Sequence, residues 1–165
     1  LNPIHEGTNG IQAIDLLGRK VVMRGGAAMA LMEREIWSTI GHADEITALY
    51  DDAAALGAAL ERMLSSASAI HSAMEQVGPR RGLANASAFM ELAGLVTMGW
   101  IWLQQAIVAS RLLDGAPDDQ DRDFLAGKLH ACHYMHNVEL PACKPLAEIL
   151  IRLDDTIHDM RSEWF

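Results

Sequence analysis

Cysteine and basic charge are the two things that this sequence has little of. Its 165 residues include two cysteines, Cys132 and Cys143, which are too few for a disulfide framework and fit a reducing cytoplasm. Lysine and arginine number 13 against 22 aspartates and glutamates, so the formal net charge is −9. Without a basic patch, the chain is not expected to bind nucleic acid or an anionic membrane surface. We therefore expect a cytoplasmic protein.

Strand patterns and targeting segments are also missing. No segment alternates apolar and polar residues over more than a few positions, and there is no signal peptide. The most apolar stretch, residues 92–103, is shorter than the ~20 residues that a membrane span needs. Glu91 and Gln104 flank it. We expect no membrane span here, but a helix that is buried on most faces of a bundle.

Helical periodicity is what the sequence does contain. Apolar residues recur in steps of three and four, most regularly from Ile46 to Val77, and glycines or prolines interrupt the pattern. Gly25 and Gly26 supply one helix stop, and Gly78-Pro79 supplies another. Helices are expected over residues 10–23, 27–40, 46–77, 82–113, 117–138 and 142–153, with Pro117 at the first position of the fifth. The predicted fold class is all-α, an up-and-down bundle of about five to six helices.

A short loop at the N-terminal end carries a lone carboxylate, Glu6. The helix that follows is predicted to have Asn9 as its N-cap, with Gln12 completing a capping box. Gly7 has no side chain, so another molecule can approach the backbone there. Glu6 is thus expected on a loop just ahead of a helix N-terminus, where its simplest role is to favour the helix dipole.

The run from Glu6 to Lys20 resembles one family closely. Acyl-CoA dehydrogenases carry a Tyr-Glu-Gly-Thr segment followed by a helix, and residues 5–8 here read His-Glu-Gly-Thr. The fifteen residues 6–20 are similar to the bacterial branch with an extended helical C-terminal domain, the 3-methylmercaptopropionyl-CoA dehydrogenase type. The rest of the chain resembles the family in its helical pattern, in the Gly25-Gly26 pair, and in Lys128 and Leu140-Pro141.

The resemblance implies a site. In the family, the glutamate removes the α proton of an acyl-CoA thioester while the β hydrogen leaves as hydride to FAD. Glu6 is thereby implied as the catalytic base, Gly7 as a substrate contact, and Thr8, Asn9 and Gly10 as flavin contacts. Simple capping stays an equal alternative for Asn9. An electron-transfer flavoprotein is the implied electron acceptor, and a homo-oligomer is the implied assembly.

His5 departs from the family pattern, which usually has tyrosine at this position. Histidine keeps a ring and a polar tip, but it is smaller and titrates near neutral pH. We hypothesise that His5 modulates the choice of acyl chain. The substitution leaves the identity of the base unaffected.

The chain starts at Leu1 rather than at methionine, so we expect a C-terminal piece of a longer polypeptide. Residues 1–24 are assigned to the catalytic-base loop and last helix of the parent dehydrogenase, and residues 25–165 to an additional helical bundle. Because the family's flavin and CoA sites lie largely upstream, the piece alone is expected to be inactive and to lack FAD. The alternative function is a non-catalytic oligomerisation or interdomain-packing module.

Histidines on the predicted helix 117–138 are the other candidate site. His130 and His133 share one face, as do His133 and His136, and Cys132 and Cys143 lie nearby in sequence. No carboxylate stands at a ligand step on this helix, and Cys132 points away from His130. Partly buried histidines are therefore expected, and no metal site.

Overall fold

The computed structural model describes residues 7–115 and 117–164, and all regular structure in these ranges is helical. The α-helices are α1 (Asn9–Asp15), α2 (Met23–Ala43), α3 (Tyr50–Val77), α4 (Pro79–Gly82), α5 (Ala86–Asp114), α6 (Asp119–Tyr134) and α7 (Cys143–Ile151). Shorter helical turns are the π-turns η1 (Leu16–Lys20) and η3 (Met135–Glu139) and the 3-10 turns η2 (Thr47–Leu49), η4 (Leu140–Ala142) and η5 (Ser162–Trp164). The predicted all-α class is confirmed.

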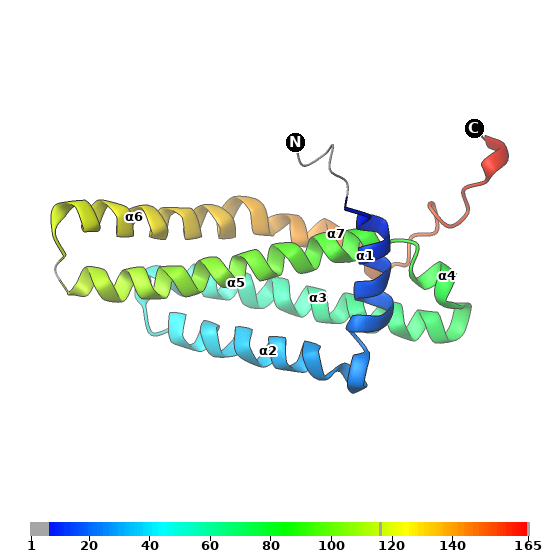
Figure 1. Cartoon of the computed structure of the whole chain (residues 1–165), viewed down its shortest axis with the longest axis horizontal. Helices are drawn as coiled ribbons and strands as arrows, with labels where there is room; N and C mark the ends of the chain where they lie inside the picture. Colours follow the sequence, from blue (N-terminus) through cyan, green and yellow to red (C-terminus); the bar gives the residue numbers. More distant parts are fainter. Residues whose placement is uncertain (1–6, 116, 165) are drawn as a thin grey trace.

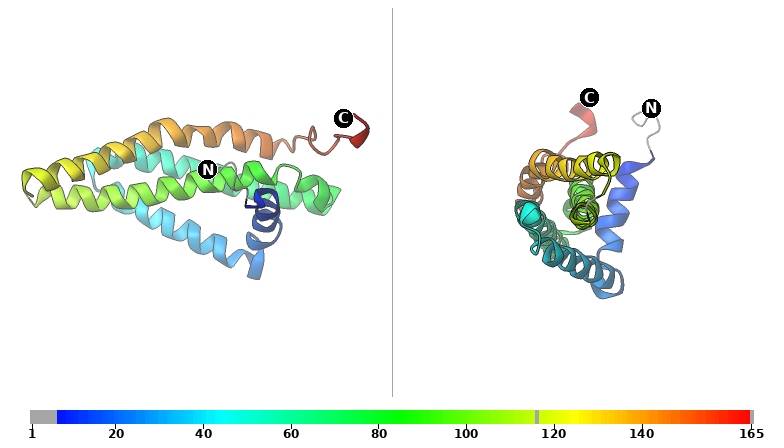
Figure 2. Two further views of the ribbon diagram at one scale, coloured as in Figure 1. Left: turned by 45° about the horizontal axis from the view of Figure 1, so that its top comes forward. Right: turned by 90° about the vertical axis from the view of Figure 1, so that its left-hand side faces the viewer.

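The long helices form an up-and-down bundle. Helices α2, α3, α5 and α6 run alternately in opposite directions, and α7 continues the direction of α6 (Figure 1). The end-on view in Figure 2 places α5 among the others, and α5 packs against α1, α2, α3, α6 and α7. Helix α1 crosses the bundle steeply instead of joining it (Figures 1 and 2). The bundle architecture agrees with the prediction.

The central position of α5 explains its composition. By length and composition alone α5 could cross a membrane. Phe89, Leu92, Val96 and Leu103 are fully buried against its neighbours, so we interpret α5 as the core helix of the bundle.

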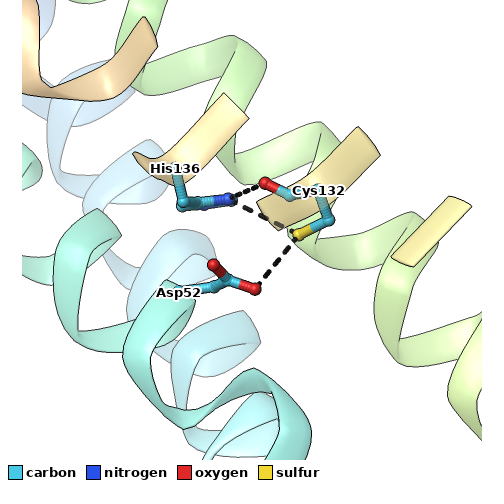
Figure 3. A group of neighbouring side chains, drawn as sticks. All are labelled: Asp52, Cys132 and His136. Atoms are coloured by element: carbon cyan, nitrogen blue, oxygen red, sulfur yellow. Dashed lines mark hydrogen bonds between the residues drawn. The ribbon is translucent and has the colours of Figure 1, made fainter. Parts of the chain in front are cut away.

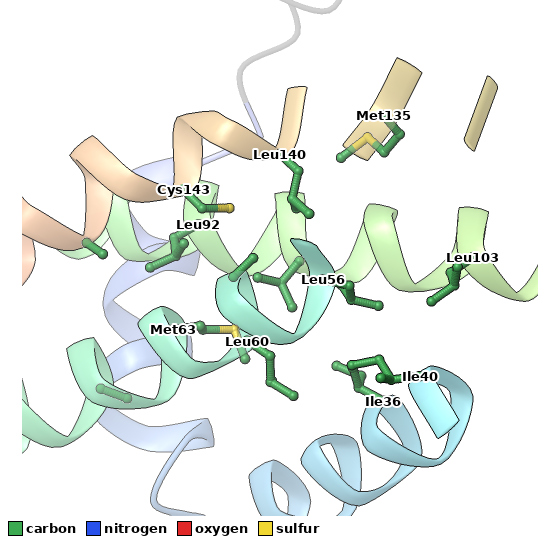
Figure 4. Close-up of a cluster of buried hydrophobic side chains, with 14 of the residues drawn as sticks. Ile36, Ile40, Leu56, Leu60, Met63, Leu92, Leu103, Met135, Leu140 and Cys143 are labelled. Carbon is green, nitrogen blue, oxygen red and sulfur yellow. The ribbon is translucent and has the colours of Figure 1, made fainter. Parts of the chain in front are cut away.

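Helix α3 supplies the side of the core that faces α5. The apolar stripe predicted for α3 is buried along most of its length. The buried apolar residues of α3 are Ala53, Leu56, Ala59, Leu60, Met63, Ala67, Ile70 and Ala73. Figure 4 shows Leu56, Leu60 and Met63 between Ile36 and Ile40 of α2 and the residues of α5, η4 and α7. Fully burying a side chain of leucine size contributes ~1.5–3 kcal/mol relative to exposure, so this seam dominates the stability of the bundle.

The break predicted at Gly25 and Gly26 lies within the first turn of α2, where the backbone is not helical. Arg24, Gly25 and Gly26 all have positive φ, at 54°, 67° and 81°. The two glycines adopt this left-handed conformation without steric cost, and the turn sends α2 back along the bundle.

The boundaries near α4 and at the start of α6 differ from the predicted ones. Pro79 ends α3 but also opens the short α4, at a position where a missing backbone N–H costs nothing. Asp118 caps α6 by accepting a hydrogen bond from the backbone N–H of Asp121. Pro117 therefore lies before the cap and not inside the first turn.

The helical spacing of Ile11, Ile14, Leu17 and Val21 predicts the buried face of the first helix, and half of this prediction is confirmed. Ala13, Leu17 and Val21 are buried against the bundle, whereas Ile11 and Ile14 are exposed. The small Ala13 allows α1 to lie close to α5, which it contacts directly. The two isoleucines thus form an exposed apolar surface on α1.

One hydrogen bond ties this first segment to α3. The His71 ring lies with Nε2 2.9 Å from the carbonyl oxygen of Leu17 and with Nδ1 2.8 Å from that of Ala67. Both oxygens can only accept, and a neutral imidazole has one N–H, so in the neutral ring the link from α3 to η1 forms in the tautomer that carries the proton on Nε2. That link joins residues 54 positions apart in the sequence.

Replacing His71 tests this link. We expect His71→Leu to lower the free energy of unfolding by ~1–3 kcal/mol, because the Leu17 carbonyl loses its partner at a half-buried position. Trypsin should also cut faster after Arg19, Lys20 and Arg24. The exposed His42 provides the control: His42→Leu should leave both the stability and the cleavage rate at these sites unchanged. Equal cleavage rates in the two variants would contradict the link.

Candidate functional site

The N-terminal candidate site lies partly within the described residues. The implied base Glu6 and the implied substrate contact His5 lie outside the described residues. Gly7, Thr8, Asn9 and Gly10 are described, and all four are exposed at the start of α1. The structure thus places the implied flavin contacts on the surface of the bundle.

The capping pattern predicted here is wrong by one residue. The helix begins at Asn9, so the N-cap position falls on Thr8, which makes no side-chain capping hydrogen bond. The Thr8 hydroxyl donates instead to the carbonyl oxygen of Gly7. Thr8 has a left-handed backbone, with φ 61° and ψ 41°, which is uncommon for a residue other than glycine. The chain therefore turns sharply just before α1.

A hydrophobic cavity of about 490 Å³ opens beside this segment, between η1, α2 and α5. Its lining is rich in methionine, the most adaptable apolar side chain, and carries one lysine. Members of the lining include Leu16, Lys20, Met29, Met32, Met63, Met90 and Met98. Met63 is buried, and Met29 and Met32 are half-buried against the core.

The three histidines of the second candidate site differ in burial. His130 is exposed, with its ring edge against the ring of His133. His133 is half-buried, and His136 is buried in η3. Cys143 is buried on α7, and the group of metal-ligating side chains found among the described residues does not include it.

A carboxylate from another helix forms a cluster with the buried Cys132 and His136. Asp52 of α3 lies 80 positions before Cys132, and its Oδ2 is 3.8 Å from the Cys132 Sγ. The same Oδ2 is 2.6 Å from Nδ1 of His133. Asp52, Cys132 and His136 are all buried, with exposed fractions of 2%, 0% and 3%. Figure 3 shows these three side chains pointing toward one another from α3, α6 and η3.

Hydrogen bonds assign the protons in this cluster. The carbonyl oxygen of Cys132 can only accept, so Nδ1 of His136, at 2.8 Å, donates to it. The Nε2 atom of His136 is then an acceptor, and it is buried without a hydrogen-bond partner among the described residues. The Cys132 thiol donates weakly to Asp52, and the Nδ1–H of His133 donates to the same carboxylate.

Burial sets the charge states of the cluster. Burial, and then the negative charge of Asp52, raises the pKa of the Cys132 thiol to about 12. Burial lowers the pKa of His136, against the opposing effects of the Cys132 carbonyl and Asp52. At neutral pH the thiol is therefore protonated and the His136 ring is neutral. A protonated buried thiol is a poor nucleophile, so the cluster is not arranged for thiol chemistry.

Sequence reasoning overlooked Asp52 because it considered one helix at a time. A signal was nevertheless present: Asp52 lies between Leu49, Ala53 and Leu56, on the face of α3 that the apolar stripe predicts to be buried. A carboxylate in such a stripe indicates a polar partner on a facing helix.

His136 also faces open space. It lines a cavity of about 250 Å³ together with Arg62, Lys144 and several small apolar residues. Burial raises the pKa of Cys143 to about 11, an effect that nearby Arg62 opposes. One side of the histidine ring therefore borders a space that is large enough for water.

Comparison with known proteins gives the family. The family model described as "Acetyl-CoA dehydrogenase C-terminal like" matches residues 28–161. Broad-specificity linear acyl-CoA dehydrogenase FadE5 of Mycobacterium tuberculosis is 27% identical over 166 residues, which cover 97% of this chain and 27% of that protein. 3-methylmercaptopropionyl-CoA dehydrogenase of Ruegeria pomeroyi is 32% identical over 136 residues, 77% of this chain and 21% of that protein.

The chain spans about a quarter of the length of these curated relatives. The family match begins at residue 28, just after the turn at Arg24, Gly25 and Gly26, and it includes α3, α5, α6 and α7. The resemblance read from the N-terminal residues is thereby confirmed by a match over most of the bundle. The chain belongs to the acetyl-CoA dehydrogenase C-terminal-like family.

Proposed function

We propose that this chain is the C-terminal part of an FAD-dependent acyl-CoA dehydrogenase, which desaturates an acyl-CoA thioester between its α and β carbons. The observation that carries the proposal is the family match over residues 28–161, together with the Glu6–Lys20 run that precedes it. Both relatives described above are named as acyl-CoA dehydrogenases. The division into a catalytic-base segment, residues 1–24, and an additional bundle, residues 25–165, belongs to the same proposal.

In this proposal Glu6 takes the α proton, so its carboxylate must lie over that carbon and be shielded from water. The segment that follows Glu6 is held firmly: α1 packs on α5, and His71 binds the Leu17 carbonyl. A base on a loop gains precision when the next helix is fixed in this way. The docked α1 therefore supports a positioning role for the bundle.

The exposed residues 7–10 fit one edge of a flavin. Helix geometry leaves the first backbone amides of α1 without intrahelical acceptors, and such amides suit a phosphate or the polar edge of a ring. FAD, when bound, accepts the hydride from the β carbon. Thr8, Asn9 and Gly10 would hold its edge, and Gly7 would let the acyl-CoA approach. These residues offer no enclosing walls, so we propose that the chain alone holds no FAD and is inactive.

The partners are part of the proposal as well. We propose acyl-CoA as the substrate, an electron-transfer flavoprotein as the electron acceptor, a homo-oligomeric assembly and a cytoplasmic location. Exposed apolar side chains on α1 and α5 support an assembly, since they remain uncovered in the single chain; they are Ile11, Ile14, Met98, Ile101, Val108 and Leu112. The same observation favours the second candidate function, a packing module without chemistry of its own.

Glu6 is tested in a polypeptide that contains this chain and its flavin-binding part. We expect Glu6→Gln to lower kcat by at least ~10²-fold, because the amide cannot accept the α proton. Flavin absorbance and acyl-CoA binding should persist. Glu45→Gln, at an exposed position between α2 and α3, is the matched control and should retain full turnover. A Glu6→Gln enzyme with normal turnover would exclude Glu6 as the base.

The hypothesis for His5 is tested in the same protein. We expect His5→Tyr to shift the ratio of kcat/KM between short and long acyl-CoA substrates, because tyrosine changes the volume and polarity beside the base. His42→Tyr, at an exposed position on α2, is the control. An unchanged preference in His5→Tyr would rule out a role of this residue in substrate choice.

A further inference from the structure

The buried cluster of Asp52, Cys132 and His136 has the composition of a metal site. One ligand atom from each residue lies within 4.8 Å of the other two, and these residues form the group of metal-ligating side chains found in the described part of the chain. A carboxylate, a thiol and an imidazole are the three side-chain types that bind zinc. Their burial distinguishes them from the scattered acidic groups of a protein surface.

Two of the three separations between the ligand atoms are close to those around one ion. Two ligands of a tetrahedral zinc ion lie ~3.5 Å apart, given Zn–S ~2.3 Å and Zn–N or Zn–O ~2.0–2.1 Å. In the structure, Sγ of Cys132 is 3.4 Å from Nδ1 of His136 and 3.8 Å from Oδ2 of Asp52. The 3.8 Å separation from Asp52 also fits a hydrogen bond from the Cys132 thiol. The assignment of a metal site therefore rests in addition on the residue types and on their charges.

We propose that Asp52, Cys132 and His136 bind one zinc ion, which ties α3 to α6 and η3. Water fills the fourth position. The sequence predicted no metal site because ligand spacing was considered within a single helix. In this site the carboxylate comes from α3.

Charge balance favours the ion. A buried carboxylate needs a compensating positive charge, and the described contacts of Asp52 offer only the His133 ring and the weak thiol donor. Zinc, one thiolate and one carboxylate together are neutral, which suits a buried site. Binding releases the Cys132 thiol proton to solvent and forms the Zn–S bond without any change in oxidation state. Zinc affinity should therefore increase with pH.

Binding through Nδ1 changes the tautomer of His136. When Nδ1 binds the ion, the ring proton moves to Nε2, and the bond from Nδ1 to the Cys132 carbonyl is given up. Nε2 is buried near Gly99 of α5 and has no hydrogen-bond partner among the described residues in the metal-free structure. The ring is neutral in both tautomers, which agrees with the lowered pKa of His136.

His133 acts as a positioning residue. Its Nδ1 lies 2.6 Å from Oδ2 of Asp52, which is hydrogen-bonding distance and is shorter than the separation of two ligands on one ion. A histidine that donates to a ligating carboxylate orients that ligand, and its loss typically lowers metal affinity ~10–100-fold.

Cobalt(II) is the direct probe, because a thiolate bound to cobalt gives a near-ultraviolet charge-transfer band. The metal-stripped 165-residue chain is titrated with Co²⁺ and then with Zn²⁺, and bound zinc is measured by mass spectrometry. We expect about one ion per chain, a thiolate–cobalt band that zinc removes, and a higher Tm with zinc. His133→Gln should keep the band but bind cobalt ~10–100-fold more weakly.

The second buried cysteine provides the matched control. Cys132→Ala should lose the band, whereas Cys143→Ala, at an equally buried position outside the cluster, should keep it. Circular dichroism checks that each variant is folded. The proposal is overturned if the wild-type chain gives no thiolate–cobalt band, if the band depends on Cys143, or if Cys132→Ala binds zinc as tightly as the wild-type chain. The wild-type titration decides the question even if a variant does not fold.

Discussion

The register of the helices depends on the burial of one carboxylate, Asp52, in an otherwise apolar seam. The helices on either side of it bury leucine, isoleucine and alanine, which pack without directional constraint. Asp52 adds direction, because a buried carboxylate requires donors at fixed positions. His133 and Cys132 supply these donors and so fix the register of α6 against α3. Sliding either helix by one turn would leave the charge unpaired.

The remaining helices are arranged around this pair. Helix α5 fills the centre and contacts α1, α2, α3, α6 and α7, while Met98, Ile101, Val108 and Leu112 on it remain exposed. Helix α1 is attached at the other side, through Ala13 and Leu17 and the hydrogen bond from His71. The loop proposed to carry the catalytic base therefore precedes a helix that the bundle holds in place. This connects the packing of the bundle with its proposed task in a dehydrogenase.

Periodicity predicted the architecture because each long helix buries one face, and a buried face repeats every three to four residues. For the first helix it predicted Leu17 and Val21 correctly but not the start: Ile11 and Ile14 are the larger residues, but close contact with α5 selects the small Ala13. The cap at Thr8 was missed because residues 8, 9 and 10 are all plausible helix starts. Asp52 was overlooked since its partners lie about 80 positions away, and sequence alone does not show which helices face each other. The family resemblance, in contrast, was readable from fifteen consecutive residues.

The claim that Asp52 holds α6 against α3 is tested most directly by the coupling free energy between Asp52 and His133. A double-mutant cycle with Asp52→Ala, His133→Ala and the double variant, measured by denaturant unfolding in the presence of a chelator, gives this quantity without any contribution from metal. The account predicts a coupling of at least ~1 kcal/mol, because the two side chains share a buried, charge-assisted hydrogen bond. Effects that add to within ~0.5 kcal/mol would contradict it.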